Sequence, residues 1–216
     1  MDAFVPKFKI CGLTRPEDAE RAVELGAWAL GMIQWPGSPR RCDPGVAAEI
    51  GARFRRRAEI VGVFVNPTLD AVTRAAEDLN LSMVQLHGDE GPVFCSEVAR
   101  RTGCRVIKAA RVRSGADIQA LGPFHTDFHL LDSFVAGVPG GTGKSFAWEL
   151  ARQHRGTPVI LSGGLTADTV GEAIATVRPY AVDVASGVES APGIKDTAKL
   201  AAFAGAVGAS AAVGAP

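Results

Sequence analysis

PVILSGGLTADTVGEAIATVRPYAVDVASGVES, residues 158–190, contains two apolar runs separated by a segment with helical spacing. The first run is Val159 to Ser162, the segment is Ala167 to Val177, and the second run is Ala181 to Ala185. Unbroken apolar runs are typical of parallel strands that are covered on both faces. The stretch therefore predicts one strand–helix–strand unit.

The same alternation extends along the rest of the chain. The other predicted strands are Phe8 to Gly12, Ala29 to Ile33, Ile60 to Asn66, Met83 to His87, Val106 to Ala110 and His129 to Asp132. The other predicted helices are Glu17 to Leu25, Val46 to Phe54, Thr68 to Leu79, Glu90 to Thr102, Ala116 to Leu121, Phe146 to His154 and Asp196 to Val207. Thr14 is positioned to cap the first of these helices.

Eight strands alternating with eight helices predict a (β/α)₈ TIM barrel. The alternative is an open doubly wound sheet, but no GxGxxG motif follows the first strand. We expect one domain over residues 1–216, with a frayed end to its Ala- and Gly-rich last segment.

Composition excludes several classes of protein. The 216 residues are 47% hydrophobic, and 23 Lys and Arg balance 23 Asp and Glu. A neutral chain argues against a general nucleic-acid or membrane surface but allows a local anion site. The chain has no apolar stretch of transmembrane length and no signal-peptide pattern, and its four cysteines include no CxxC pair. We therefore expect a cytoplasmic protein with reduced thiols.

In a barrel, the active site lies at the carboxyl ends of the strands. Cys11 and Asp132 end two of the predicted strands. A cysteine is usually a small buried hydrophobe, but a thiol beside Lys9 could be partly ionised and act as a base. Asp132 could cap a loop, or it could donate a proton as a half-buried acid. A base and an acid on opposite sides of a pocket would suit proton transfer.

Glycine turns follow the last three predicted strands. They are Gly140 to Gly143, Gly163 with Gly164, and Ser186 with Gly187. Flexible turns are the simpler interpretation, but the turns after strands seven and eight lie where phosphate-binding barrels present backbone N–H groups. They predict a phosphate site.

Three further side chains are candidates for substrate binding. Arg40 follows the second strand, where a guanidinium could bind a carboxylate or simply be a solvated basic residue. Gln85 and His87 lie two residues apart, which places both on one face of the fourth strand. No His, Asp and Glu cluster has the spacing of metal ligands, so no metal site is predicted.

Several longer segments of the chain contain these candidates. They are KICGLT (9–14), SPR (38–40), VGVFVN (61–66), VQLHG (84–88), GGTG (140–143), LSGGL (161–165) and DVASGVE (183–189), with Gly193, Lys195 and Asp196. Together these segments resemble the phosphoribosylanthranilate isomerase family of tryptophan biosynthesis. The resemblance covers residues 9–196 and implies a (β/α)₈ barrel that converts N-(5-phosphoribosyl)anthranilate to 1-(2-carboxyphenylamino)-1-deoxyribulose 5-phosphate. This is an Amadori rearrangement that requires no cofactor.

The resemblance also implies roles for individual residues. Cys11 would be the general base, Asp132 the general acid, and Arg40 the ligand of the anthranilate carboxylate. The glycine turns would hold the phosphate, and Asp183 would be a polar residue of the eighth strand's mouth. This chain has Gln34 where many relatives have an aromatic residue, and Ala185 where serine is common.

Two alternatives remain at this point. One is another phosphosugar barrel enzyme, although the related histidine-pathway isomerase would require an aspartate in place of Cys11. The other is a phosphosugar-binding protein without catalysis, for which a paired acid and base would have no use. The expected partner is a small phosphosugar, with no nucleic acid or membrane, and the protein is expected to be a monomer or a homodimer.

Overall fold

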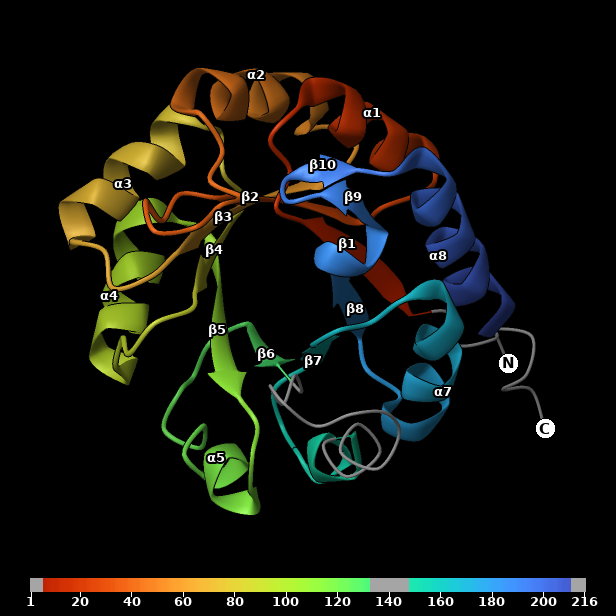
Figure 1. The fold of residues 1–216 in the computed structure, drawn as a ribbon. Helices are drawn as coiled ribbons and strands as arrows, with labels where there is room; N and C mark the ends of the chain where they lie inside the picture. The colour runs from red at the N-terminus through yellow and green to blue at the C-terminus, as the bar shows by residue number, and fades with distance from the viewer. Residues whose placement is uncertain (1–5, 133–147, 211–216) are drawn as a thin grey trace.

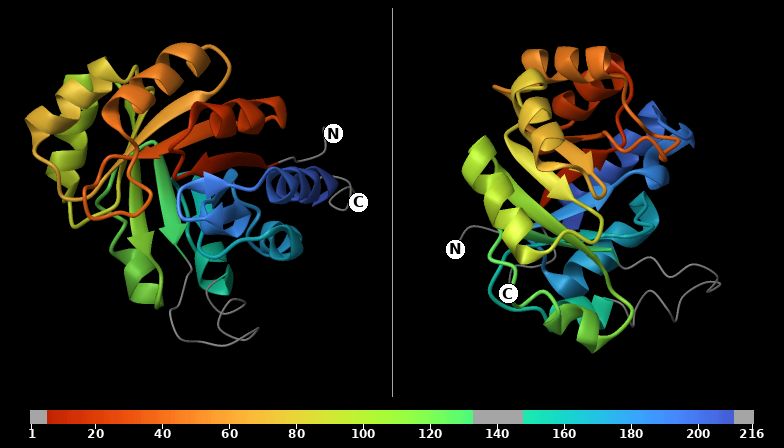
Figure 2. Two further views of the ribbon diagram at one scale, coloured as in Figure 1. Left: turned by 45° about the horizontal axis from the view of Figure 1, so that its top comes forward. Right: turned by 90° about the vertical axis from the view of Figure 1, so that its left-hand side faces the viewer.

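The computed structural model describes residues 6–132 and 148–210. Its strands β1 to β8 pair side by side in parallel and close into a barrel, with the helices outside (Figures 1 and 2). The strands are β1 (Lys7–Cys11), β2 (Ala29–Ile33), β3 (Glu59–Phe64), β4 (Met83–Leu86), β5 (Arg105–Arg111), β6 (Phe128–Asp132), β7 (Val159–Ser162) and β8 (Ala181–Val184). The predicted barrel is confirmed.

The helices follow the strands in order. They are α1 (Pro16–Glu24), α2 (Pro44–Phe54), α3 (Leu69–Asp78), α4 (Pro92–Thr102), α5 (Gly115–Gln119), α7 (Ala167–Val177) and α8 (Thr197–Ser210), with residues 148–152 helical between β6 and β7. The turn at residues 140–143 and the first part of the helix predicted from Phe146 lie outside the described residues. No helix in the described ranges is long and apolar enough to cross a membrane.

Two features differ from the prediction at this level. Thr14 does not cap α1: its Oγ1 donates to the carbonyl oxygen of Gly193 at 2.5 Å, and Arg15 occupies the N-cap position. Between β8 and α8 the chain also forms a 3₁₀ turn, η1 (Ser186–Val188), and a hairpin of β9 (Glu189–Ala191) and β10 (Ile194–Lys195). The sequence analysis missed this hairpin.

Alternation along the strands divides the core into two layers. Ile10 and Phe8 of β1 point outward and pack in the cluster that contains buried helix residues such as Phe54 and Phe203. Cys11 belongs to a second, inner cluster contributed almost wholly by strands. Side chains two residues apart point to the same side of a strand, so every second strand residue faces the barrel interior.

Aromatic rings lie at the amino ends of the strands. Trp28 precedes β2, Tyr180 precedes β8 and Phe128 begins β6, and their ring centroids are 5.1 to 5.7 Å apart. The ammonium group of Lys7 lies 4.9 Å from the centre of the Tyr180 ring. This end is filled by ring packing and a cation–π contact, which leaves the opposite end for chemistry.

The strand register brings polar residues together at the carboxyl ends. Lys9 of β1 is paired with Asp183 of β8, and Asp132 of β6 is paired with Ser162 of β7. These residues are far apart in sequence, and closure of the barrel makes them neighbours.

A histidine pair lies on the outer side of β6. His129 is buried, and its Nε2 donates to the carbonyl oxygen of Phe124 at 3.1 Å. Its Nδ1 therefore accepts from Nε2 of His154 at 2.8 Å. Burial lowers the pKa of His129 to about 4, so the folded protein holds this ring neutral at pH 7.

The lowered pKa of His129 predicts that the folded protein loses stability in mild acid. The unfolded chain takes up a proton at a higher pH than the folded one, so stability is full above about pH 6.5 and falls as the pH drops toward 4. Between pH 7 and pH 5 we expect the free energy of unfolding to fall by about 2 kcal/mol through this residue. Urea unfolding of wild type and His129→Gln at both pH values measures it. The exposed His125 provides the matched control, His125→Gln; an equal pH dependence in wild type and His129→Gln would contradict the assignment.

Candidate active site

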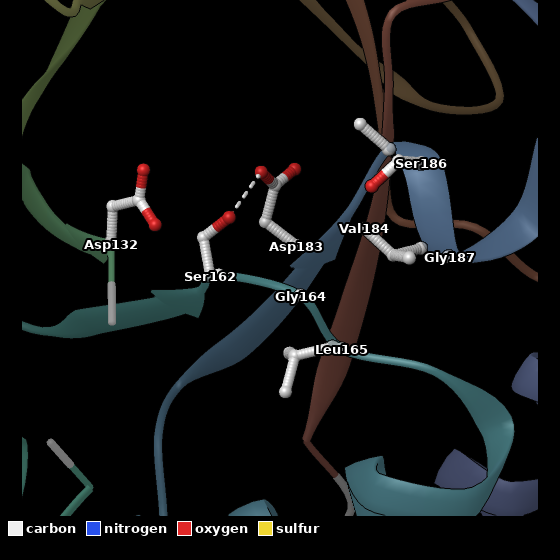
Figure 3. Close-up of a pocket in the computed structure, with 10 residues that line it drawn as sticks. Asp132, Ser162, Gly164, Leu165, Asp183, Val184, Ser186 and Gly187 are labelled. Atoms are coloured by element: carbon white, nitrogen blue, oxygen red, sulfur yellow. Dashed lines mark hydrogen bonds between the residues drawn. The ribbon is translucent and has the colours of Figure 1, made fainter. Parts of the chain in front are cut away.

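A cavity of about 230 Å³ opens where β6, β7 and β8 end (Figure 3). It brings together six of the residues predicted for the site: Asp132, Gly163, Gly164, Asp183, Ser186 and Gly187. Ser162, Leu165, Val184 and Ala185 complete its lining. In Figure 3 the side chains of Asp132, Ser162 and Asp183 point to the same side of the strands.

The glycine turns form one wall of this cavity. Gly163 and Gly164 have φ angles of +108° and +62°, which residues other than glycine rarely adopt. A Cβ atom on Gly187 would overlap the carbonyl oxygen of Leu165. The turns after β7 and β8 therefore pack backbone against backbone, and only glycine fits at Gly187.

Asp183 is held at the inner wall by two partners. Its Oδ1 lies 2.7 Å from the ammonium group of Lys9, and its Oδ2 accepts from Ser162 Oγ at 3.1 Å. Lys9 is fully buried inside the barrel. Burial works to lower the pKa of Lys9, but Asp183 and Cys11 raise it above its usual value. Lys9 is thus a permanent cation beneath the cavity.

Cys11 lies at the same end of the barrel, at the end of β1, beside Lys9. A Cβ atom built on Gly31 would lie 3.0 Å from both the Cys11 sulfur and the Lys9 nitrogen, so the two groups are neighbours. The position of this thiol beside Lys9 does not give it a lowered pKa. Burial raises the pKa of Cys11, and the opposing effect of Lys9 does not overcome it. Desolvation of a thiolate in the barrel interior is the stronger effect.

Gln85 and His87 meet on one face of the β4 end, as their spacing predicts. The Gln85 amide donates to His87 Nδ1 at 2.9 Å, so Nε2 carries the imidazole proton. That Nε2 lies 4.0 Å from Asp132 Oδ2. Burial lowers the pKa of His87, so this ring is neutral and directs an N–H group toward Asp132. His87 also lines a second cavity of about 450 Å³ beside β5.

Arg40 does not have a free guanidinium. Its Nε lies 3.0 Å from both carboxylate oxygens of Glu189, and its Nη2 lies 2.8 Å from Oε2. Lys195 Nζ contacts the same carboxylate at 2.9 Å. Burial raises the pKa of Glu189, but Arg40 and Lys195 lower it below its usual value, so the carboxylate is ionised.

Glu189 and Lys195 were noted in the sequence only as parts of a family motif, with no role attached to either. Arg40 and Glu189 are 149 positions apart, and the missed β9–β10 hairpin carries both Glu189 and Lys195. Within the described residues, no three His, Cys, Asp or Glu side chains form a group that could hold a metal ion.

Comparison with known proteins gives a consistent result. The family model for N-(5'phosphoribosyl)anthranilate (PRA) isomerase matches residues 8–206. A curated relative from Trichlorobacter lovleyi, N-(5'-phosphoribosyl)anthranilate isomerase, is 48% identical over 199 residues, which cover 91% of this chain and 95% of that protein.

Solved structures agree with the sequence match. A phosphoribosyl anthranilate isomerase in complex with reduced 1-(o-carboxyphenylamino)-1-deoxyribulose 5-phosphate has a TM-score of 0.81 and 36% identity, covering 94% of this chain and 99% of that chain. Monomers generated from the dimeric phosphoribosylanthranilate isomerase of Thermotoga maritima match with a TM-score of 0.81, 34% identity and the same coverage. A monomer or homodimer remains a prediction for this protein. Its sequence and its barrel place the chain in the N-(5'-phosphoribosyl)anthranilate isomerase family, and it is an isomerase.

Proposed function

We propose that this protein converts N-(5-phosphoribosyl)anthranilate to 1-(2-carboxyphenylamino)-1-deoxyribulose 5-phosphate, as a step of tryptophan biosynthesis. One observation carries the proposal: Asp132 and the two glycine turns line a single cavity, at the barrel end where Cys11 also lies. That arrangement provides an acid, a base and an anchor for a phosphate dianion.

The first half of the reaction needs a proton donated to the ring oxygen and a proton removed from C2. Asp132 protonates the ring oxygen of the furanose, the bond between that oxygen and C1 breaks, and a protonated Schiff base forms between C1 and nitrogen. Cys11, as thiolate, removes the proton from C2, and the electron pair forms the C1–C2 double bond of an enolamine. Transfer of a proton from the Cys11 thiol to C1 and loss of the enol proton to the Asp132 carboxylate then give the ketone at C2 and restore both residues, with no net change in atoms or electrons.

The residues around this pair fix its geometry. Backbone N–H groups of the turns at Gly163–Gly164 and Ser186–Gly187 bind the phosphate, and Arg40 binds the anthranilate carboxylate. Lys9 stabilises the thiolate of Cys11 while it exists, because the charge of this buried ammonium group opposes the effect of burial on the pKa of Cys11. Gln85 orients His87, whose neutral N–H group faces Asp132. A substrate anchored at both ends places its reacting carbons between acid and base.

A fluorescence assay tests the proposal directly. Freshly made phosphoribosylanthranilate is mixed with purified protein, and its consumption is followed against a control without enzyme. We expect catalytic turnover and formation of the deoxyribulose product. Binding of the substrate without turnover would reject the enzymatic function and favour the phosphosugar-binding alternative.

Gly187→Ala is expected to damage phosphate binding selectively. The new methyl group must push the Leu165 carbonyl away and so displace the turn after β7. Loss of one or two hydrogen bonds to a charged group raises KM by about 10- to 100-fold, with a smaller effect on kcat. Steady-state kinetics measures both constants. Gly91→Ala is the control because a Cβ atom there meets open space; an unchanged KM in Gly187→Ala would argue against phosphate at this turn.

A further inference from the structure

The guanidinium of Arg40 uses one of its two edges on Glu189. Nε and Nη2 form the side edge, and both contact the Glu189 carboxylate, at 3.0 and 2.8 Å. A guanidinium is a planar fork that can bind carboxylates along more than one edge. The outer edge, formed by Nη1 and the second hydrogen of Nη2, is left to face away from Glu189. The Arg40 side chain is 25% exposed, so solvent and ligands can reach it.

Glu189 is itself rigidly held. Its side chain is 5% exposed, and its Oε1 accepts from Lys195 Nζ at 2.9 Å and from the Gly193 backbone N–H at 3.3 Å. Lys195 also donates to the carbonyl oxygens of Cys11 at 2.6 Å and Ala185 at 3.1 Å. An ammonium group with three acceptors has all its donors in use. The β9–β10 hairpin therefore ties the position of Arg40 to the ends of β1 and β8 (Figure 1).

The stem of Arg40 is fixed as well. A Cβ atom on Gly12 would lie 3.0 Å from Arg40 Cδ, so the glycine provides the space through which the side chain passes. The backbone N–H of Arg40 donates to Ser38 Oγ at 3.1 Å. With its stem and one edge restrained, the guanidinium is oriented before any ligand arrives.

The charges of this cluster favour an incoming anion. Two cations, Arg40 and Lys195, share the single carboxylate of Glu189. One positive charge is therefore not neutralised within the cluster, and of its two cations Arg40 has the more exposed side chain, at 25% against 0% for Lys195. One carboxylate on a ligand would complete the balance with paired hydrogen bonds.

We propose that Glu189 is the positioning residue for carboxylate recognition: it holds the side edge of Arg40 so that the outer edge faces the carboxylate of the substrate. This inference rests on the proposed function, because it takes the anthranilate carboxylate as the ligand of Arg40. It also predicts whether substrate binding strengthens or weakens when Glu189 is removed. If Glu189 merely competed with the substrate for Arg40, its removal would strengthen binding; as a positioning residue, its removal weakens binding.

The test compares two substrates in wild type and Glu189→Gln. One is phosphoribosylanthranilate, and the other is N-(5-phosphoribosyl)aniline, which lacks the carboxylate. In Glu189→Gln we expect kcat/KM for the anthranilate compound to fall about 10- to 100-fold, mainly through KM. For the aniline compound we expect wild type and variant to agree within about threefold. Arg40→Lys should show the same selective loss, and the double variant should lose little more than either single one.

Two further variants control for the loss of a negative charge. Glu20→Gln removes one partner of the exposed Arg53–Glu20 ion pair and should leave kcat/KM unchanged for both substrates. Glu189→Asp keeps the charge, so it should restore part of the anthranilate activity that Glu189→Gln loses. Melting temperatures show whether each variant folds.

Each outcome separates the two proposals. If wild type converts neither compound, the proposed function fails. If wild type prefers the anthranilate compound but Glu189→Gln keeps or improves that preference, the positioning role is rejected and the function stands. An equal loss on both compounds also rejects it, since Glu189 would then only maintain the fold of the hairpin.

Discussion

Asp132→Asn is expected to lower kcat by about 10²- to 10⁴-fold, the usual contribution of a general acid. Asparagine has the shape of aspartate but no proton to give to the furanose oxygen. The side chain of Asp132 is 22% exposed and ends β6 at the cavity, so the change leaves the barrel core untouched. Without a proton donor the ring opens as an alkoxide, which is a poor leaving group at neutral pH.

Binding of reduced 1-(o-carboxyphenylamino)-1-deoxyribulose 5-phosphate, a product analogue, separates this loss of kcat from a loss of binding. The analogue has no ring oxygen to protonate, so its dissociation constant should agree within about threefold between wild type and Asp132→Asn. Asp70→Asn is the control for removing a negative charge, because Asp70 is exposed on α3. A kcat in Asp132→Asn within about threefold of wild type would remove Asp132 from the mechanism.

The barrel could be predicted because its strands and helices have local signals. Ala29–Ile33 and Val159–Ser162 are unbroken apolar runs, and Ala167–Val177 is a helical segment ending before proline; the structure has all three with the predicted bounds. The β9–β10 hairpin could not be found this way. Its strands have three and two residues, which is too short for any periodicity to appear.

The site was predicted at the level of its residues but not of their partners. Strand ends in a barrel converge, so Cys11 and Asp132 could be assigned to the same end of the barrel from position alone. The pKa of Cys11 depends on how much water the barrel interior excludes, and the partner of Arg40 depends on a contact across most of the chain. Both are properties of tertiary packing that no local pattern carries.

Cys11→Ser and Cys11→Ala are both expected to lower kcat by about 10²- to 10⁴-fold, the usual contribution of a general base. A hydroxyl group is nearly the size of a thiol but is a far weaker acid, so serine provides no basic anion under conditions where a thiolate forms. Cys11 is only 6% exposed in the barrel interior, so alanine leaves an empty space there. Serine nearly fills that space, and comparison of the two variants therefore separates the effect of the cavity from the loss of the thiol.

The raised pKa of Cys11 gives this prediction a second measurement. Burial, only partly offset by Lys9, keeps the thiol protonated at neutral pH, so the reactive thiolate fraction increases about tenfold per pH unit below the pKa. We expect the rate at which iodoacetamide inactivates wild type, which depends on the thiolate alone, to rise about tenfold per pH unit between pH 7 and pH 9, and the residual activity of Cys11→Ala to be insensitive to the reagent. Cys95→Ala removes another buried thiol, on α4, and should retain both the rate and the pH profile of wild type. If iodoacetamide inactivates Cys11→Ala with the same pH dependence as wild type, another group provides the base, because the titration would then persist without the Cys11 thiol.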